Sequence, residues 1–165
     1  MKFKDGAGMH SGQQGVTLAE LMIALVILAV ILALGVPSFR NSTANASIRG
    51  TAMDLVASLN AARAEAVSFR SPITVESAGG AVWSTSGWKY THPEDGEFAF
   101  RASGNTTVQA GGGVSSVIFG ADGTVDLAGA PELVLEVCDS RAGETGRLIR
   151  VNRLGRISNE ELVCP

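Results

Sequence analysis

The junction between Gly15 and the apolar run that follows it constrains this chain more than any other feature of its sequence. A polar leader ends at Gly15, and a segment of 21 residues, from Val16 to Val36, then carries Glu20 as its only charge. As a helix this segment would be about 31 Å long, which matches the roughly 30 Å hydrocarbon core of a bilayer. The segment is therefore long and apolar enough to span a membrane.

The position of this junction differs from that in ordinary secreted proteins. A secretory signal is cleaved after its apolar core, whereas the best junction here lies before it. The sequence Gly-Val-Thr-Leu-Ala-Glu-Leu-Met at positions 15–22 resembles the class III signal of type IV prepilins. The resemblance implies that a prepilin peptidase cleaves between Gly15 and Val16 and methylates the new amino terminus. Valine at that position departs from the phenylalanine that the family usually has.

Glu20 makes the resemblance physically specific. A carboxylate carried to the bilayer centre costs about 2.5–3.5 kcal/mol, so Glu20 needs a cationic partner or access to water. In pilins the matching glutamate meets the free amino terminus of a neighbouring subunit, which implies an assembly role for Glu20. The alternative is a position near the membrane interface, where Glu20 reaches water.

The helical pattern continues past the apolar run to about Arg70, and Pro72 ends it because the residue before a proline disfavours the α region. Pro37 removes one backbone hydrogen bond, so we expect a kink there. In pilins the matching zone bends or melts when subunits pack, which implies an assembly role for Pro37; a simple kink at the membrane surface is the alternative.

One face of the second half of the helix is apolar. Residues spaced by three and four are predicted to pack on a sheet: Ile48, Ala52, Leu55, Leu59, Ala62, Ala66 and Phe69. Arg49, Ser58, Ala61 and Glu65 are expected mostly on the wetter side.

Short β runs separated by glycine-rich turns follow Pro72. The candidate strands are 73–75, 81–83, 88–90, 98–100, 106–108, 117–119, 124–127, 133–137 and 148–151. Ala121-Asp122-Gly123 is typical of a hairpin turn. Because no second long helix joins these strands, the sheet is expected to be mainly antiparallel. The predicted fold class is α+β, a long N-terminal helix packed on a small antiparallel β domain, as in type IV pilins.

The two cysteines, Cys138 and Cys164, predict a disulfide. An exported chain with an even number of cysteines favours one, and Cys164 would otherwise lie on a fraying terminus. Closing this loop would stabilise the fold by roughly 3–4 kcal/mol. Two separate buried thiols are the alternative.

A narrower resemblance covers most of the mature chain. Several stretches are similar to the FimT/GspH family of minor pilins and pseudopilins: 55–56, 62–67, Trp83, Trp88, Phe119, Gly123, and 147–156 with the two late cysteines. Glu76 departs from the cysteine of many relatives. The resemblance implies a leader at 1–15, a transmembrane and assembly helix at 16–37, an amphipathic second half at 38–71 and a GspH/FimT-like β domain at 72–165.

Catalysis is not expected from the residue types present. His92 is the one histidine beyond the leader, so no Ser-His-Asp set can form, and no Cys-x-x-Cys pair or phosphate-binding glycine motif occurs. The stretch around His92, with Pro93, Asp95 and Gly96, is predicted to be a solvated turn. No metal or cofactor is expected. Trp83 and Trp88 are predicted to be core or half-buried sheet residues.

The C-terminal arginines suggest a DNA-binding alternative. Arg147, Arg150, Arg153 and Arg156 recur every third residue in a chain of net charge −3. Guanidinium groups bind phosphates. Some FimT-like proteins are DNA receptors for natural transformation and use a C-terminal Gly-Arg-x-Arg motif, which implies the same function as an alternative here. The matching stretch at 155–158, Gly-Arg-Ile-Ser, lacks the second arginine. In a strand, residues three apart also point to opposite faces, so the four arginines share one surface only if a turn or bulge intervenes.

The sequence therefore predicts a minor pilin or pseudopilin, a non-enzymatic subunit of a type IV pilus or a type II secretion system. It would be held in the bacterial inner membrane by one helix, with its β domain in the periplasm, until it enters the filament. Its expected partners are the prepilin peptidase, other major and minor pilins or pseudopilins and, in the DNA-binding alternative, DNA. A third alternative is a soluble periplasmic protein cleaved after Ala46, because Ala44-Asn45-Ala46 fits an ordinary signal peptidase.

Overall fold

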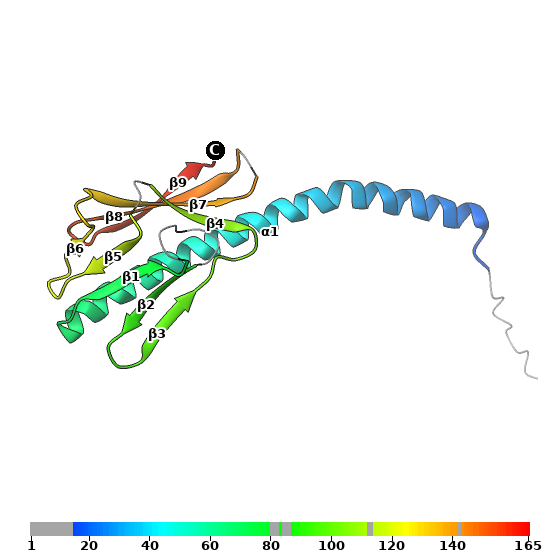
Figure 1. The fold of residues 1–165 in the computed structure, drawn as a ribbon. Coiled ribbons are helices and arrows are strands. Elements are labelled where there is room, and N and C mark those ends of the chain that lie inside the picture. Colours follow the sequence, from blue (N-terminus) through cyan, green and yellow to red (C-terminus); the bar gives the residue numbers. More distant parts are fainter. Residues whose placement is uncertain (1–14, 80–82, 84–86, 112–113, 142) are drawn as a thin grey trace, which may run out of the picture. The chain divides into compact units, whose positions relative to one another are not determined.

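The computed structural model of the chain describes residues 15–79, 83, 87–111, 114–141 and 143–165. The chain divides into two compact units, one up to Phe39 and the other from Arg40 to Pro165. The first unit holds the apolar part of the helix. The second, which we call the head, holds the rest of the helix and all the described strands (Figure 1).

Helix α1 extends over Leu18–Phe69, 52 residues, close to the predicted range of 16 to 70. Arg70 follows with a positive φ of 49°, and the N–H of Ser71 donates to the carbonyl of Ala66 at 3.2 Å. Pro72 then prevents further helix, because it disfavours the α region at Ser71. The chain turns from here into the first strand.

The strands form two antiparallel sheets. The five-stranded sheet has the order β3-β2-β1-β5-β6 and the four-stranded sheet the order β4-β7-β8-β9. The strands are β1 (Ile73–Ser77), β2 (Trp88–His92), β3 (Gly96–Phe100), β4 (Thr106–Gly111), β5 (Ser116–Phe119), β6 (Val125–Asp126), β7 (Glu132–Asp139), β8 (Thr145–Asn152) and β9 (Ile157–Val163). All their pairings are antiparallel, which confirms the α+β prediction.

Two features of the sheets differ from the prediction. A single sheet was expected, and strand β9 was not foreseen. The asparagine and glycine of the turn before β9 could have indicated this strand. In that turn Asn152 Oδ1 accepts the N–H groups of Leu154 and Arg156, and Gly155 has a φ of 75°. Residues 158–161 are all polar, so the strand lacks the alternation of apolar and polar residues from which strands are predicted. Of the candidate strand at 81–83, only Trp83 is described, and it lies outside the strands.

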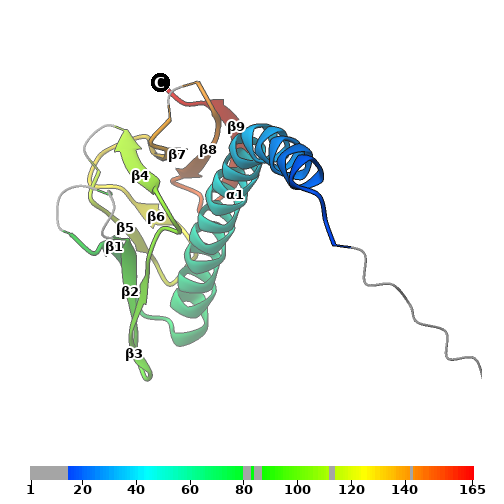
Figure 2. The same ribbon diagram turned by 90° about the vertical axis from the view of Figure 1, so that its right-hand side faces the viewer.

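The core of the head lies between the second part of α1 and the strands, and Figure 2 shows the helix running along them. The predicted apolar face is buried at Ile48, Ala52, Leu55, Leu59, Ala62 and Ala66, whereas Phe69 is 40% exposed. Ser58 was expected on the wetter side, but it is buried, because its hydroxyl accepts the indole N–H of Trp88 at 2.7 Å. Trp83 and Trp88 are both buried, as predicted.

Arg63 ties the helix to turns of both sheets. Its Nε donates to the carbonyl of Gly123 at 3.0 Å, in the predicted β5–β6 turn, and its guanidinium donates to the carbonyl of Leu154 at 3.3 Å, in the β8–β9 turn. The N–H of Val125 donates to the carbonyl of Arg153 at 2.9 Å and links the turns directly. The two sheets therefore meet at these turns, against the helix.

The predicted disulfide joins Cys138 to Cys164, with a Cα–Cα distance of 5.9 Å. Cys138 belongs to β7 and Cys164 follows β9, so the bridge crosses the strand between them, β8, at Gly146. A Cβ at Gly146 would lie 2.6 Å from the carbonyl oxygen of Val137 and would collide with the sulfur of Cys164. The bridge thus needs glycine at this position.

Gly146→Ala should prevent the disulfide from forming or strain the sheet beneath it, with a loss of about 3–4 kcal/mol of stability if the bridge is lost. Thiol labelling of the unreduced full-length protein and its thermal unfolding would measure both effects. Gly111→Ala, in strand β4 of the same sheet, is the control, since its Cβ would meet neighbours only at 3.6 Å or more. An intact bridge with unchanged stability in Gly146→Ala would contradict this account.

Candidate functional site

The start of α1 carries the residues predicted for processing and assembly. Residues 15–17 precede the helix without regular secondary structure and are exposed. The hydroxyl of Thr17 accepts the N–H of Glu20 at 3.2 Å, and its carbonyl accepts the N–H of Leu21 at 3.1 Å. Thr17 is therefore the N-cap, and Glu20 is the third residue of the helix, the pattern of a capping box. Its carboxylate also lies at the positive end of the helix dipole.

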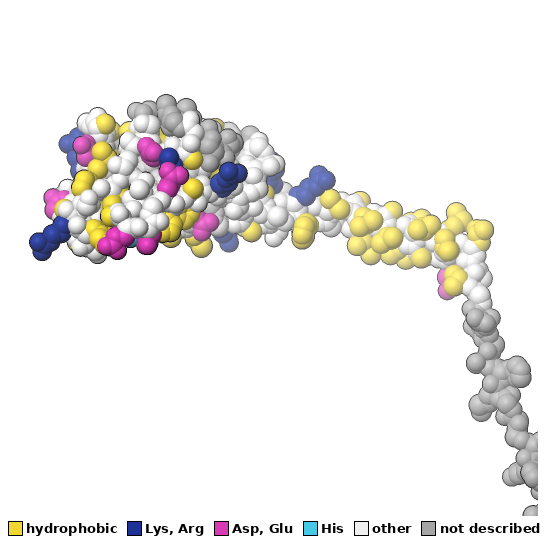
Figure 3. Space-filling view, turned by 60° about the horizontal axis from the view of Figure 1, so that its bottom comes forward, with side chains coloured by type: hydrophobic (Ala, Val, Ile, Leu, Met, Phe, Trp, Pro, Cys, Tyr) yellow, Lys and Arg dark blue, Asp and Glu magenta, His cyan; other side chains and the backbone are white. Residues whose placement is uncertain are grey.

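The apolar part of α1 is exposed along its length. Leu21, Leu28 and Leu34, for example, are 50–72% exposed, and Figure 3 shows hydrophobic side chains along this part of the helix. Its most apolar 18-residue window has a mean hydropathy of 2.8, which makes it a candidate membrane span. Large apolar side chains exposed in such numbers require a lipid or protein environment.

The structure separates Arg147 from Arg150. They lie an odd number of residues apart in β8 and so point to opposite faces of the four-stranded sheet, as predicted. Arg147 lies 3.5 Å from a carboxylate oxygen of Glu161, and Arg150 lies 2.8 Å from Glu132 and 3.9 Å from Glu160. Both cations thus face acids of the neighbouring strands.

Two further arginines of this region, Arg153 and Arg141, also have local partners. Arg153 donates to the carbonyls of Ala130 and Gly129 at 3.1 and 3.0 Å, while Arg156 follows it in the β8–β9 turn. Upstream, a hydrogen bond from Arg141 to Asp139 at 2.8 Å raises the pKa of the guanidinium. Arg150 and Arg156 line one pocket together with Glu132 and Glu160. Because Arg147 lies on the opposite face of the sheet, the structure does not gather all four arginines into one basic surface.

His92 is itself buried and packs against two aromatic rings, so the prediction that it belongs to a solvated turn was wrong. The turn itself, at 93–95, is present, but His92 ends β2 and is only 9% exposed. Its ring contacts those of Phe69 and Phe98, at centroid distances of 5.0 and 6.1 Å. Its Nδ1 accepts the N–H groups of residues 94 and 95 at 3.1 and 2.8 Å and so fixes the turn.

Tyr90 connects this cluster to the helix. Its hydroxyl donates to Glu65 Oε1 at 3.1 Å, while Glu65 Oε2 is buried and lies 4.0 Å from His92 Nε2. Burial and the bond to Glu65 raise the pKa of Tyr90 to about 12. In the described part of the chain, no three His, Cys, Asp or Glu side chains are grouped to hold a metal ion.

Comparison with known proteins identifies the family of the chain. The family described as Type II transport protein GspH matches residues 51–155, and the Prokaryotic N-terminal methylation motif matches residues 10–36. The chain belongs to the GspH family. It is a minor pilin or pseudopilin, a structural subunit of a type IV filament system.

Two crystal structures of the type IV minor pilin FimU from Pseudomonas aeruginosa strain PAO1 are similar to this GspH-family chain. The first has 24% identity and a TM-score of 0.59, and the match covers 72% of this chain and 91% of that chain. The second has 26% identity and a TM-score of 0.54, with 68% and 91% covered. No curated protein matches the chain.

Sequence reasoning found the parts of this GspH-family chain that depend on local pattern and missed those that depend on packing. The Thr17 cap could have been recognised, because Thr-x-x-Glu before an apolar run is a known helix start. The burial of His92 had no such signal. It follows from the approach of Phe69 at the end of α1 to strands β2 and β3, far apart in the chain.

Tyr90 is the only tyrosine in the chain, so its ionisation can be followed directly by near-ultraviolet absorbance. Its pKa of about 12 in the folded protein lies above the ordinary value of about 10. The stability it contributes is therefore complete below pH 10 and should be lost as the pH rises from 10 to 12. Glu65→Gln, which removes the neighbouring charge, should lower the titration midpoint. A folded protein whose tyrosine titrates near pH 10 would contradict the assigned contact.

Proposed function

We propose that this chain is a single-pass protein of the bacterial inner membrane, with its head in the periplasm, that enters a pilus or pseudopilus as a minor subunit. The observation that carries the proposal is the uncovered apolar stretch of α1, which begins with the capped Glu20. The apolar side chains suit lipid before assembly and neighbouring helices afterwards.

Processing between Gly15 and Val16 is the first step of this proposal. Residues 15–17 are exposed and lie outside the helix, so the junction is accessible to a prepilin peptidase. Cleavage would leave a new amino group on Val16, beside the N-cap Thr17. Methylation of that group on Val16 would keep its positive charge.

Glu20 and the amino terminus then form the proposed assembly contact. In the first turn of α1 the carboxylate is stabilised by the helix dipole, but in an apolar filament core it needs a cation. The amino terminus of a neighbouring subunit supplies one. The contact selects subunits whose helices are correctly staggered, because a wrong stagger leaves both charges unpaired. Pro37, the residue directly after the apolar run, would let the helix bend as the subunits pack.

The other two functions have less support from the described residues. Arg147 and Arg150 face acids on opposite sides of a sheet, so a continuous basic surface for the DNA backbone is lacking there. Cleavage after Ala46 would cut α1 within its helical range, at the bond to Ser47 and close to the buried Ile48. We therefore favour the filament subunit.

Gly15→Val should abolish processing, because a β-branched side chain at the junction hinders the approach of the peptidase to the backbone. Mass spectrometry of the protein purified from membranes would show the uncleaved chain in place of one that begins with methylated Val16. Gly12→Ala, in the leader but away from the junction, is the control and should be processed normally. A mature terminus at Ser47 would instead support the soluble periplasmic protein.

Glu20→Gln should be processed but should enter filaments roughly tenfold less than the natural chain, since a lost charge pair in an apolar core costs more than 1.4 kcal/mol. Immunoblots of sheared pilus and pseudopilus fractions would measure incorporation and identify the filament. Glu20→Asp, which keeps the charge, should retain most of the incorporation of the natural chain. Equal incorporation of the glutamine and aspartate variants would contradict the assembly role of Glu20.

A further inference from the structure

Strand β3 is an open edge of the five-stranded sheet. It pairs with β2, and no other described strand pairs with its far side; Figure 1 shows it at the margin of the head. Four of its five residues, 96–99, are exposed, more than in any other described strand of similar length. An edge strand directs backbone N–H and C=O groups outward, where an extended segment of another chain can pair with them.

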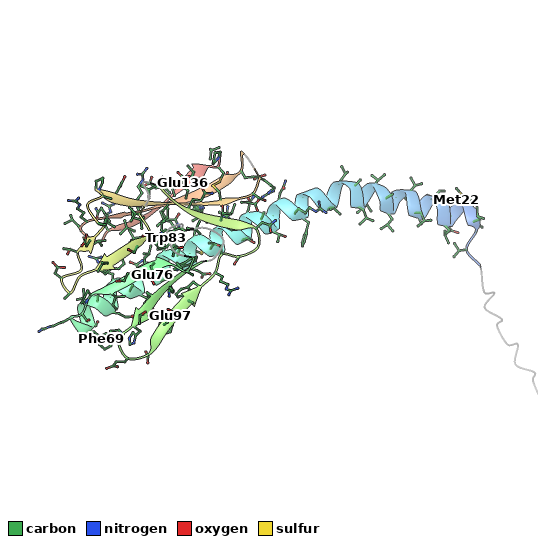
Figure 4. The ribbon with its side chains drawn as sticks, in the orientation of Figure 1. Met22, Phe69, Glu76, Trp83, Glu97 and Glu136 are labelled. Atoms are coloured by element: carbon green, nitrogen blue, oxygen red, sulfur yellow. A yellow bond between two sulfur atoms is a disulfide. The ribbon has the colours of Figure 1, made fainter. Side chains whose placement is uncertain are left out.

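The outer face of the sheet has a row of alternating charges that ends at this edge. Glu76 of β1 pairs directly with Lys89 of β2. The Nζ of Lys89 lies 3.5 Å from Glu76 and 2.8 Å from Glu97 of β3. Figure 4 labels the two acids. The row therefore runs acid, base, acid, and the acid at the edge is half-exposed. Because opposite charges on neighbouring strands stabilise a sheet, a base is favoured at the next position.

The other face has a row of rings that also ends at the edge. Trp88 of β2 stacks on Phe100 of β3 with a centroid distance of 5.7 Å, and Tyr90 stacks on Phe98 at 5.4 Å. Phe98 is 39% exposed, and Phe69, which reaches the same cluster through His92, is 40% exposed. An apolar side chain at the next position would bury both rings.

The hairpin that presents this edge is already ordered. His92 Nδ1 holds the turn between β2 and β3 through two backbone N–H groups, and the bond from Tyr90 to Glu65 fixes β2 to the helix. A partner strand would therefore bind without ordering the hairpin first, which lowers the entropic cost of binding.

We propose that β3 is a docking edge that accepts an extended segment with alternating basic and apolar side chains from a neighbouring filament subunit. The basic side chains would lie beside Glu97, and the apolar ones would cover Phe98 and Phe69. A second copy of this chain is a poorer partner, because β3 paired with β3 puts two Glu97 carboxylates on one face without adding a cation. The inference deepens the proposed function, since the segment comes from another subunit.

A peptide assay on the full-length protein in non-ionic detergent micelles tests this docking edge. The probe is a dye-labelled peptide, acetyl-Thr-Lys-Val-Lys-Val-Thr amide, and its counterpart has glutamate in place of each lysine. Fluorescence anisotropy measures binding, and hydrogen exchange locates it. We expect the lysine peptide to bind and to slow exchange of the β3 amides at 96–100, but not of those in β9.

Charge reversal makes the test specific. Glu97→Lys should weaken binding of the lysine peptide about fivefold and strengthen binding of the glutamate peptide by a similar factor, as expected for one cross-strand charge pair. The matched control is Glu136→Lys, which replaces an acid on the four-stranded sheet and should change the binding of neither peptide. Circular dichroism checks that both variants fold.

Three results would overturn the proposal: no binding of the lysine peptide, no added protection of β3, or equal effects of the two substitutions. If the β3 amides were already protected from hydrogen exchange without peptide, and sedimentation showed dimers, the edge would be assigned to a second copy of this chain instead. The assay needs neither cleavage nor filament assembly, so its failure is distinguishable from failure of the proposed function.

Discussion

The packing of the second part of α1 against both sheets is the interaction on which the rest of the head depends. Burial of residues such as Leu55 and Leu59 removes one face of the helix from water, and Arg63 then binds the turns of both sheets. Neither sheet has another described helix to cover it, so the small core is built around this one element. The disulfide across Gly146 adds a covalent link to a sheet that has little core of its own.

The same helix serves two different environments. In the head its apolar residues form one stripe, because the opposite side faces water. Before Phe39 they surround the helix, which suits lipid or the packed helices of a filament. The two family matches agree with this division. The GspH match, at residues 51–155, covers most of the head, and the methylation motif, at residues 10–36, covers the start of the helix.

Several charged side chains on the surface of the head are arranged in local pairs. Arg147, Arg150 and Lys89 each lie beside acids on adjacent strands, so the charges of these three cations are balanced locally. The edge at β3 is different, because its row of charges and its row of rings both stop at positions exposed to solvent. Specific contacts with neighbouring subunits are thus better placed at this edge than on the arginines.

The sequence by itself determined the elements that depend on local pattern. The apolar run, the long helix, its buried stripe, the antiparallel strands, the Asp122 turn and the disulfide all follow from spacing, turn residues and cysteine count. Only the tertiary structure decided the division into two sheets, strand β9, the burial of His92 and Ser58, and the acids that lie beside Arg147 and Arg150. The physical reason is that helix periodicity and turn chemistry act between residues close in the chain, whereas burial and charge pairing depend on distant residues that the core brings together.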